Sequence, residues 1–225
     1  MTLEQLLART RILADDIVTG GAELWTDEFL TEGLNLGEQE ACIRGHLIQE
    51  IEGARCEVEL VDDQRTYALD PLVLDVLGAR LRTQDCDLER VAIESVRFSN
   101  KRGGPPAAFA LMNDGSATTG KTLVLDRAAP PLDTQDTIDL HISRLPLTPM
   151  SAPNHVPEIG VVHHDALCYW ALHLAFLVRD TDAEDPQRAA DMEARFAARF
   201  GIREDANVAR KQQRHRVPVV RMRYP

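Results

Sequence analysis

Eight residues near the middle of the chain have the types and spacing to bind a nucleotide. Gly115 to Thr122 read GSATTGKT and match the pattern G-x-x-x-x-G-K-[ST] of phosphate-binding loops. In such a loop, backbone N–H groups surround the phosphates, the lysine (here Lys121) contacts them, and the last hydroxyl (Thr122) binds Mg²⁺. This chemistry requires a strand before the loop and a helix that begins at the Gly-Lys-Thr, so that the helix N-terminus faces the phosphates.

The residues on either side of this motif fit a different structure. A strand-like run, AFALM, precedes it, but the residues that follow read TLVLD, a second strand-like run, and Pro130-Pro131 come soon after. We therefore predict a β-hairpin, in which a glycine-rich turn joins two short antiparallel strands. On this interpretation Lys121 at most contacts another protein. Nucleotide binding through Gly115–Thr122 is the alternative.

Other reactive side chains are dispersed along the chain. His163 and His164 are adjacent, so on a helix they would point in different directions and suit a shared metal poorly. The sequence also lacks the G-x-S-x-G and H-E-x-x-H motifs. Four cysteines without a C-x-x-C pair predict isolated reduced thiols: Cys42, Cys56, Cys86 and Cys168. We therefore expect no metal and no cofactor, and no catalytic arrangement stands out.

The composition is that of an ordinary globular protein, with 44% apolar and 27% charged residues in 225. No apolar run approaches the ~18 residues that a membrane helix needs. The first residues, MTLEQLLARTRILADDIV, lack the cationic region and continuous apolar block of a signal peptide. We therefore expect no membrane span and a cytoplasm-like compartment.

Charge is distributed unevenly along the chain. The whole chain has a net charge of −11, but residues 201–225 carry seven basic and two acidic side chains, a net of +5. The first 200 residues therefore carry −16. An acidic body argues against sequence-specific DNA binding. A basic segment on such a body suggests that the segment docks on another surface.

Residues 1–54 are predicted to form the N-terminal helices of a bundle. Thr2 and Gln5 suit a capping box at the start of the first helix, and a second helix is expected from Thr26 to about Gln49. Each interior glycine costs a helix about 1 kcal/mol relative to alanine, so a glycine stripe indicates close approach of another helix or subunit. The small residues recur at every fourth position of the second helix: Gly33, Gly37, Ala41 and Gly45.

The middle of the chain changes to the two-residue period of strands. Residues 55–147 form a β-rich block of short strands separated by glycine and proline, with the clearest alternation at Ile138, Leu140 and Ile142. Residues 148–201 return to helices, an apolar one over 158–179 and a last one capped by Asp185. Residues 202–225 form a basic extended tail. The predicted class is α+β: an antiparallel helical bundle with an inserted small antiparallel β-sheet or sandwich.

Two stretches of this sequence resemble the head-to-tail adaptor proteins of tailed bacteriophages. LWTDEFLTEGLNLGEQEACIRGHLI (24–48) is similar to the family's helix W-[ST]-D-E-E-L…L-N-x-A-Q-x-E-A. Residues 144–201 are similar to its C-terminal half, with a strand ending in Arg-Leu-Pro, a Pro-Glu-Ile, a histidine before an apolar helix, an acidic loop and a final helix. Y-x-L-D-P (67–71) and TLVLD also fit. Gly33 and Gly37 depart from the family, where bulkier residues are expected.

The resemblance implies a structural protein of the virion neck, not an enzyme, that is made in the host cytoplasm. Such adaptors form a ring of identical subunits, commonly twelve, beneath the portal protein. The ring joins tail or nozzle proteins to the capsid and lines a channel through which double-stranded DNA passes without specific binding. The alternatives are the nucleotide-binding protein above and a monomeric module whose β block binds a partner.

The tail is the expected portal-binding segment of such an adaptor. Its basic residues suit an acidic portal surface, and its apolar residues could anchor there. The residues expected to contact the portal are Arg210, Lys211, Arg214, Arg216, Val217, Val219, Arg221, Arg223 and Tyr224.

Overall fold

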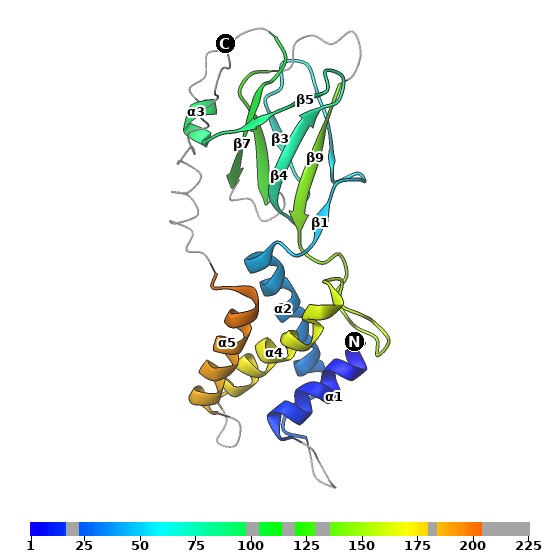
Figure 1. Ribbon diagram of the computed structural model, residues 1–225, viewed down its shortest axis with the longest axis vertical. Helices are drawn as coiled ribbons and strands as arrows, with labels where there is room; N and C mark the ends of the chain where they lie inside the picture. Colours follow the sequence, from blue (N-terminus) through cyan, green and yellow to red (C-terminus); the bar gives the residue numbers. More distant parts are fainter. Residues whose placement is uncertain (17–22, 98–103, 114–119, 129–135, 180–183, 204–225) are drawn as a thin grey trace, which may run out of the picture. The chain divides into compact units, whose positions relative to one another are not determined.

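A computed structural model describes residues 1–16, 23–97, 104–113, 120–128, 136–179 and 184–203 (Figure 1). Within them the chain divides into two compact units. One comprises Met1–Glu50, Leu72–Asp75 and Ser143–Arg203, and the other comprises Ile51–Pro71 and Val76–Ile142. The first unit is helical and the second is built from strands, which confirms the predicted α+β class: helices from both ends of the chain pack together, and small sheets come from the middle.

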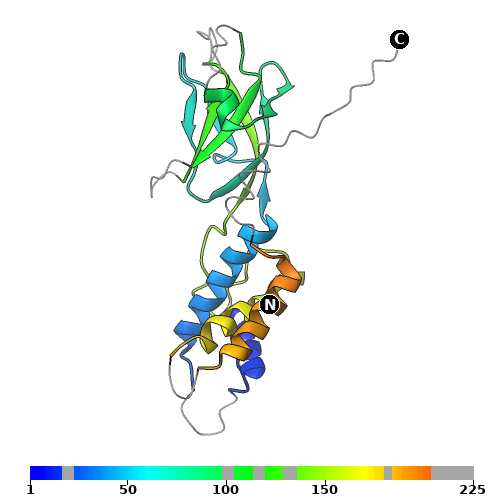
Figure 2. The same ribbon diagram turned by 90° about the vertical axis from the view of Figure 1, so that its left-hand side faces the viewer.

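The helical unit is organised around α4, an apolar helix that contacts α1, α2 and α5. Figures 1 and 2 show α4 between α2 and α5. Every residue of α4 is buried or half-buried, as its continuous apolar sequence predicts for a central helix. The described helices of this unit are α1 (Leu3–Ala14), α2 (Asp27–Gly45), the 3-10 helix η1 (Val161–Ala166), α4 (Leu167–Phe176) and α5 (Pro186–Phe200).

The predicted helix starts are confirmed, whereas two predicted lengths are wrong. Thr2 and Gln5 form the capping box of α1, and the Asp185 side chain accepts the Arg188 N–H at the start of α5. The second helix ends at Gly45 instead of Gln49, because His46 adopts a left-handed conformation with φ 47°. The apolar helix expected over 158–179 is a 3-10 helix at first and becomes α-helical only over Leu167–Phe176.

Two glycines of α2 allow its backbone to lie directly against α4. A Cβ atom added at Gly33 would lie 3.1 Å from both Cα and Cβ of Ala171. One added at Gly37 would lie 3.1 Å from Cβ of Trp170 and 3.3 Å from the carbonyl oxygen of Leu167. The other two members of the stripe differ in their surroundings: Ala41 is fully buried, and a Cβ at Gly45 would meet the side chain of Leu47.

A buried carboxylate of α2 holds the segment that leads into η1. One Glu38 oxygen accepts the backbone N–H of Glu158 at 2.5 Å and that of Ile159 at 3.2 Å, and Glu38 is only 1% exposed. Burial raises the pKa of the Glu38 carboxyl above its ordinary value, and the nearby Glu158 carboxylate adds to this rise, while the two N–H bonds oppose it. These two bonds fix the segment that precedes η1 against α2.

Arg144, the last residue of β9 (Thr137–Arg144), pairs with one carboxylate at the start of the strands of the middle region and one that follows them. Its guanidinium pairs with Glu50 and, at 2.5 Å, with Glu158, and only 9% of its side chain is exposed. Its backbone N–H also donates to the carbonyl of Ile48. The chain segments that lead into and out of the strands of the middle region are thereby tied to each other and to the Glu38 contact.

The described strands of the middle region form two sheets. Their bounds are β1 (Gln49–Glu50), β2 (Glu57–Glu59), β3 (Thr66–Ala68), β4 (Val73–Leu81), β5 (Cys86–Asp87), β6 (Glu89–Arg90), β7 (Ala108–Asn113), β8 (Lys121–Leu125) and β9 (Thr137–Arg144), and a short helix, α3 (Ile93–Arg97), follows β6. One sheet has the order β1-β9-β4-β5, with β2 also paired to β9, and the other has the order β3-β8-β7-β6. Ile138, Leu140 and Ile142 are buried, as their alternation predicts.

The last two residues of the GSATTGKT motif, Lys121 and Thr122, begin strand β8, where a phosphate-binding loop would have the start of a helix. β8 begins at Lys121 and pairs antiparallel with β7, with Lys121 opposite Asn113 and Thr122 opposite Met112. On its other side, Thr122 pairs with Ala68 of β3. This confirms the predicted hairpin strands, and residues 115–119 of the motif lie outside the described residues. Because Lys121 and Thr122 are part of a sheet, no helix N-terminus faces a phosphate here.

We predict that Gly33→Val lowers the free energy of unfolding by about 2–3 kcal/mol, because the new side chain would overlap the α4 backbone at Ala171. Urea unfolding followed by circular dichroism measures the change. Ala194→Val is the matched control, since Ala194 is exposed on α5 and loses only helix propensity, about 0.7 kcal/mol. Equal losses in the two variants would show that the α2–α4 contact is not tight.

We also predict that the Glu38 carboxyl makes the free energy of unfolding depend on pH. A carboxyl whose pKa is higher in the folded than in the unfolded protein binds its proton more tightly when folded, so stability increases as pH falls through the folded-state pKa toward the ordinary value of 4.5. The unfolding free energy of the wild type relative to Glu38→Gln should therefore rise as the pH is lowered from 7 to 5. Glu52→Gln, at an exposed carboxylate, should show no such trend. A constant difference for Glu38→Gln would contradict the prediction.

Candidate docking groove

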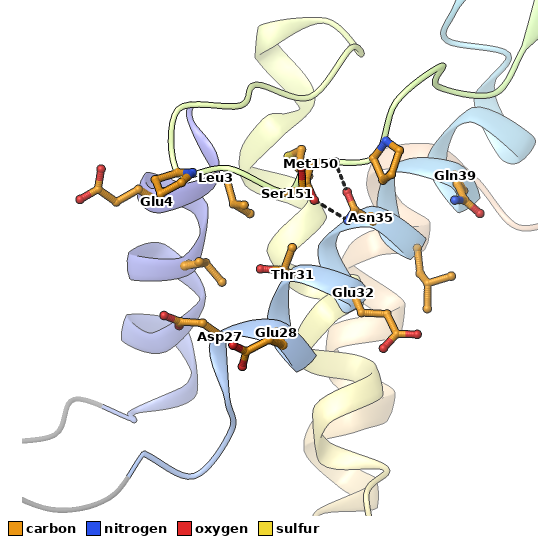
Figure 3. A pocket seen from close by; sticks show the side chains of 14 residues that line it. Leu3, Glu4, Asp27, Glu28, Thr31, Glu32, Asn35, Gln39, Met150 and Ser151 are labelled. Atoms are coloured by element: carbon orange, nitrogen blue, oxygen red, sulfur yellow. Dashed lines mark hydrogen bonds between the residues drawn. The ribbon is translucent and has the colours of Figure 1, made fainter.

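The helical unit carries a groove of about 750 Å³ along α2, from Asp27 to Gln39 (Figure 3). α1 forms one side, α2 forms the other side, and the loop 149–153 closes one end. The lining residues are Leu3, Glu4, Leu7, Asp27, Glu28, Thr31, Glu32, Asn35, Leu36, Gln39, Pro149, Met150, Ser151 and Pro153.

The floor of the groove is apolar. Leu3 and Met150 are 4% and 3% exposed and belong to the core, and Leu7 packs against the same core. Leu36 lies in the groove with 41% of its surface exposed. An occupant that places apolar side chains here would remove this surface from water, at about 25 cal/mol per Å² buried.

The rim of the groove is acidic. Glu4, Asp27, Glu28 and Glu32 line it, and none of the lining residues is basic. Figure 3 shows these carboxylates spread along α1 and α2. Asp27 is paired with Arg11 at 2.7 Å, outside the lining, whereas Glu28 and Glu32 are exposed and have no ion-pair partner among the described residues. The groove therefore favours a positively charged occupant with apolar side chains.

Asn35 fixes the loop that closes one end of the groove. Its side-chain NH₂ donates to the carbonyl of Met150 at 3.0 Å, and its side-chain oxygen accepts the Met150 N–H at 2.8 Å. Figure 3 shows both bonds. Because the two bonds use the amide donor and acceptor together, the position of Met150 relative to α2 is defined in the absence of an occupant.

The two buried thiols of the helical unit are held in the protonated form. Burial raises the pKa of the Cys42 thiol to about 12 and that of Cys168 to about 11, so both stay protonated at neutral pH. No group of three or more His, Cys, Asp or Glu side chains suited to a metal occurs in the described part of the chain. In the same residues, no helix has the length and apolar character to span a bilayer.

The residues singled out from the sequence lie in three places. Gly33, Gly37 and Ala41 are buried in α2, beside the groove-lining residues of the same helix. Lys121 and Thr122 lie in β8 of the other unit. The tail residues from Arg210 to Tyr224 lie outside the described residues.

Sequence reasoning missed the groove itself. A signal was present, because Glu28, Glu32 and Leu36 repeat at i, i+4 on an exposed side of α2, where two like charges destabilise a helix slightly. The loop 149–153 lies more than a hundred residues from α2 in the sequence, and no sequence pattern indicated that the two segments would meet.

A comparison with protein families identifies the relatives of this chain. The model of the SU10 adaptor protein family matches residues 1–222. The chain belongs to this family of phage head–tail adaptors. A search of the curated proteins gives no match. The match includes the helical unit, the inserted sheets and most of the basic tail, so the family resemblance seen in the sequence over residues 24–201 is confirmed.

We predict that Asn35→Ala releases the loop 149–153 from α2, because it removes both bonds to Met150. Loss of two hydrogen bonds to a partly buried loop should lower the unfolding free energy by about 1–3 kcal/mol and speed hydrogen exchange at the Met150 N–H about tenfold or more. Gln39→Ala is the control on the same helix, because Gln39 is exposed and lines the same groove. Unchanged exchange at Met150 in Asn35→Ala would show that the loop is held by other contacts.

Proposed function

We infer that this adaptor forms a ring of identical subunits beneath the phage portal and joins the capsid to the tail. Membership of the SU10 adaptor protein family over residues 1–222 is the observation that carries this proposal. The copy number expected from the resemblance is twelve. The ring would surround the channel through which double-stranded DNA leaves the capsid.

The charge of the chain supports a channel that does not retain DNA. DNA binding depends on basic side chains that neutralise phosphates and release counterions. The chain instead carries −11 overall, with −16 in its first 200 residues. A ring of such bodies would repel the phosphate backbone, so a genome could pass without binding.

The basic segment supports attachment to the portal. Residues 204–225 contain six Arg or Lys side chains against two acidic ones, together with Val217, Val219, Val220 and Tyr224. Charged residues steer the encounter with an acidic surface, and buried aromatic and apolar residues supply most of the binding energy. We propose that this segment contacts the portal, and that tail or nozzle proteins bind the opposite side of the ring.

Deletion of residues 210–225 should abolish docking on purified portal rings, because the proposed contacts lie in this segment. Electron microscopy of the mixture and mass measurement of the complex provide the readout. The wild type should add a ring of density to the portal, and the deletion variant should leave the portal bare while its circular dichroism spectrum remains that of the folded chain.

A charge-matched pair refines this experiment. Arg214→Gln with Arg216→Gln should weaken docking about tenfold or more. Arg179→Gln with Arg195→Gln removes the same charge from exposed positions of the helical unit and should leave docking unchanged. A wild-type chain that stays monomeric beside portal rings would overturn the proposed function, and docking by the deletion variant would overturn the role of the segment.

A further inference from the structure

A row of acidic residues along α2 leads to Glu40, which forms an ion pair with Arg203. Glu28, Glu32, Leu36 and Glu40 follow one another at i, i+4 and so lie along one slowly turning line of the helix. Glu40 pairs with Arg44 at 2.8 Å and with Arg203 at 3.4 Å. Arg203 is the last described residue before the basic segment, so that segment starts one helical turn from the groove.

The chain beyond Arg203 has the composition that the groove favours. Residues 204–225 are basic overall and contain the apolar run VPVV and a methionine. The groove offers four carboxylates around an apolar floor with no basic lining residue. Opposite charges on the two surfaces and apolar side chains on both make them complementary.

We propose that, in the unassembled subunit, the groove is the docking site of the chain's own C-terminal segment, residues 204–225. The segment runs from Arg203 back along α2, from Glu40 toward Glu28. Its arginines and Lys211 face the carboxylates of Glu28 and Glu32, and its apolar residues cover Leu36. The groove thereby shields a strongly basic segment until the subunit meets its partner.

The dimensions of the chain allow this path. Glu40 and Glu28 are twelve residues apart on α2, a distance of about 18 Å along a helix. Lys211 is eight residues beyond Arg203, and eight extended residues span up to about 28 Å. The first cluster of basic residues in the segment, Arg210 and Lys211, can therefore reach both Glu32 and Glu28.

The short connection also favours the chain's own segment over that of a second copy. A segment tethered one turn from its site has an effective concentration in the millimolar range, far above that of other subunits in dilute solution. The charges are exposed, so each pair contributes little and salt weakens the contact. A partner with a larger acidic surface can displace the segment. This proposal concerns the free subunit and goes beyond the proposed portal attachment.

Carbodiimide cross-linking of the full-length wild-type chain, without portal, tests the proposal. The reagent joins a lysine amine to a carboxylate that it contacts, and Lys211 is the one lysine of residues 204–225. We expect mass spectrometry to find Lys211 joined to Glu28 or Glu32 in low salt. The yield should fall about fivefold in 0.5 M NaCl, where the screening length is about 4 Å.

Mixing chains labelled with ¹⁵N and unlabelled chains separates the two possible sources of the segment. Links within one isotope class support the proposal, and links that mix the classes overturn it because the segment then comes from another subunit. Lys211 linked mainly to carboxylates outside the groove would also overturn it. Portal is not present, so either failure leaves the proposed portal attachment untouched.

A pair of double variants provides the matched control. Glu28→Gln with Glu32→Gln removes the two carboxylates that Lys211 is proposed to contact, and we expect the total yield of links from Lys211 to fall about fivefold. Glu52→Gln with Glu193→Gln removes the same charge from exposed positions outside the groove and should leave the links unchanged. Equal effects of both double variants would mean that net charge, rather than the groove, attracts the segment, and would overturn the proposal.

Discussion

The close backbone contact of α2 with α4 is the constraint on which the helical unit depends. α2 precedes the β strands and α4 follows them, so this contact closes a loop that contains the whole middle of the chain. Closing so long a loop costs conformational entropy that packing must offset. Gly33 and Gly37 let the two backbones meet, with Ala171 and Leu167 at distances that leave no room for a larger side chain. The helix propensity lost at two glycines is the cost of this contact.

Two charged groups are buried in the same helical unit, one within α2 and one at the end of β9. Glu38 and Arg144 are each less than 10% exposed, yet each is satisfied, Glu38 by two backbone N–H groups and Arg144 by two carboxylates. Burying such groups is unfavourable without partners. With partners they fix one geometry, because a shifted segment would leave a charge unpaired. The glycines thus allow α2 and α4 to pack closely. The polar contacts of Glu38 and Arg144 fix how the segments that they join are aligned.

Local rules of sequence predicted the local features well. The capping box at Thr2, the cap at Asp185, the alternation of β9 and the β7–β8 hairpin each depend on neighbours in sequence, and each is confirmed. The predicted end of α2 and the predicted start of the apolar helix were wrong: α2 ends where His46 adopts positive φ, which is rare for a residue other than glycine, and the segment before α4 is a 3-10 helix. The groove was not predicted because its walls come from three segments that are separate in the sequence, and only α2 carries a visible pattern.

The α2–α4 contact and the proposed contact of the groove with the basic segment differ in how they respond to salt. This difference matters when a subunit changes partners during assembly. The α2–α4 contact at Gly33 and Gly37 involves no charged group, so screening by salt affects it little. The acidic groove and the basic segment are exposed charges, whose attraction falls as salt rises. On our proposal, a subunit can therefore exchange one electrostatic partner for another without unfolding. The glycine stripe and the acidic stripe run along the same helix, so α2 serves the stable core with one side and the exchangeable contact with the other.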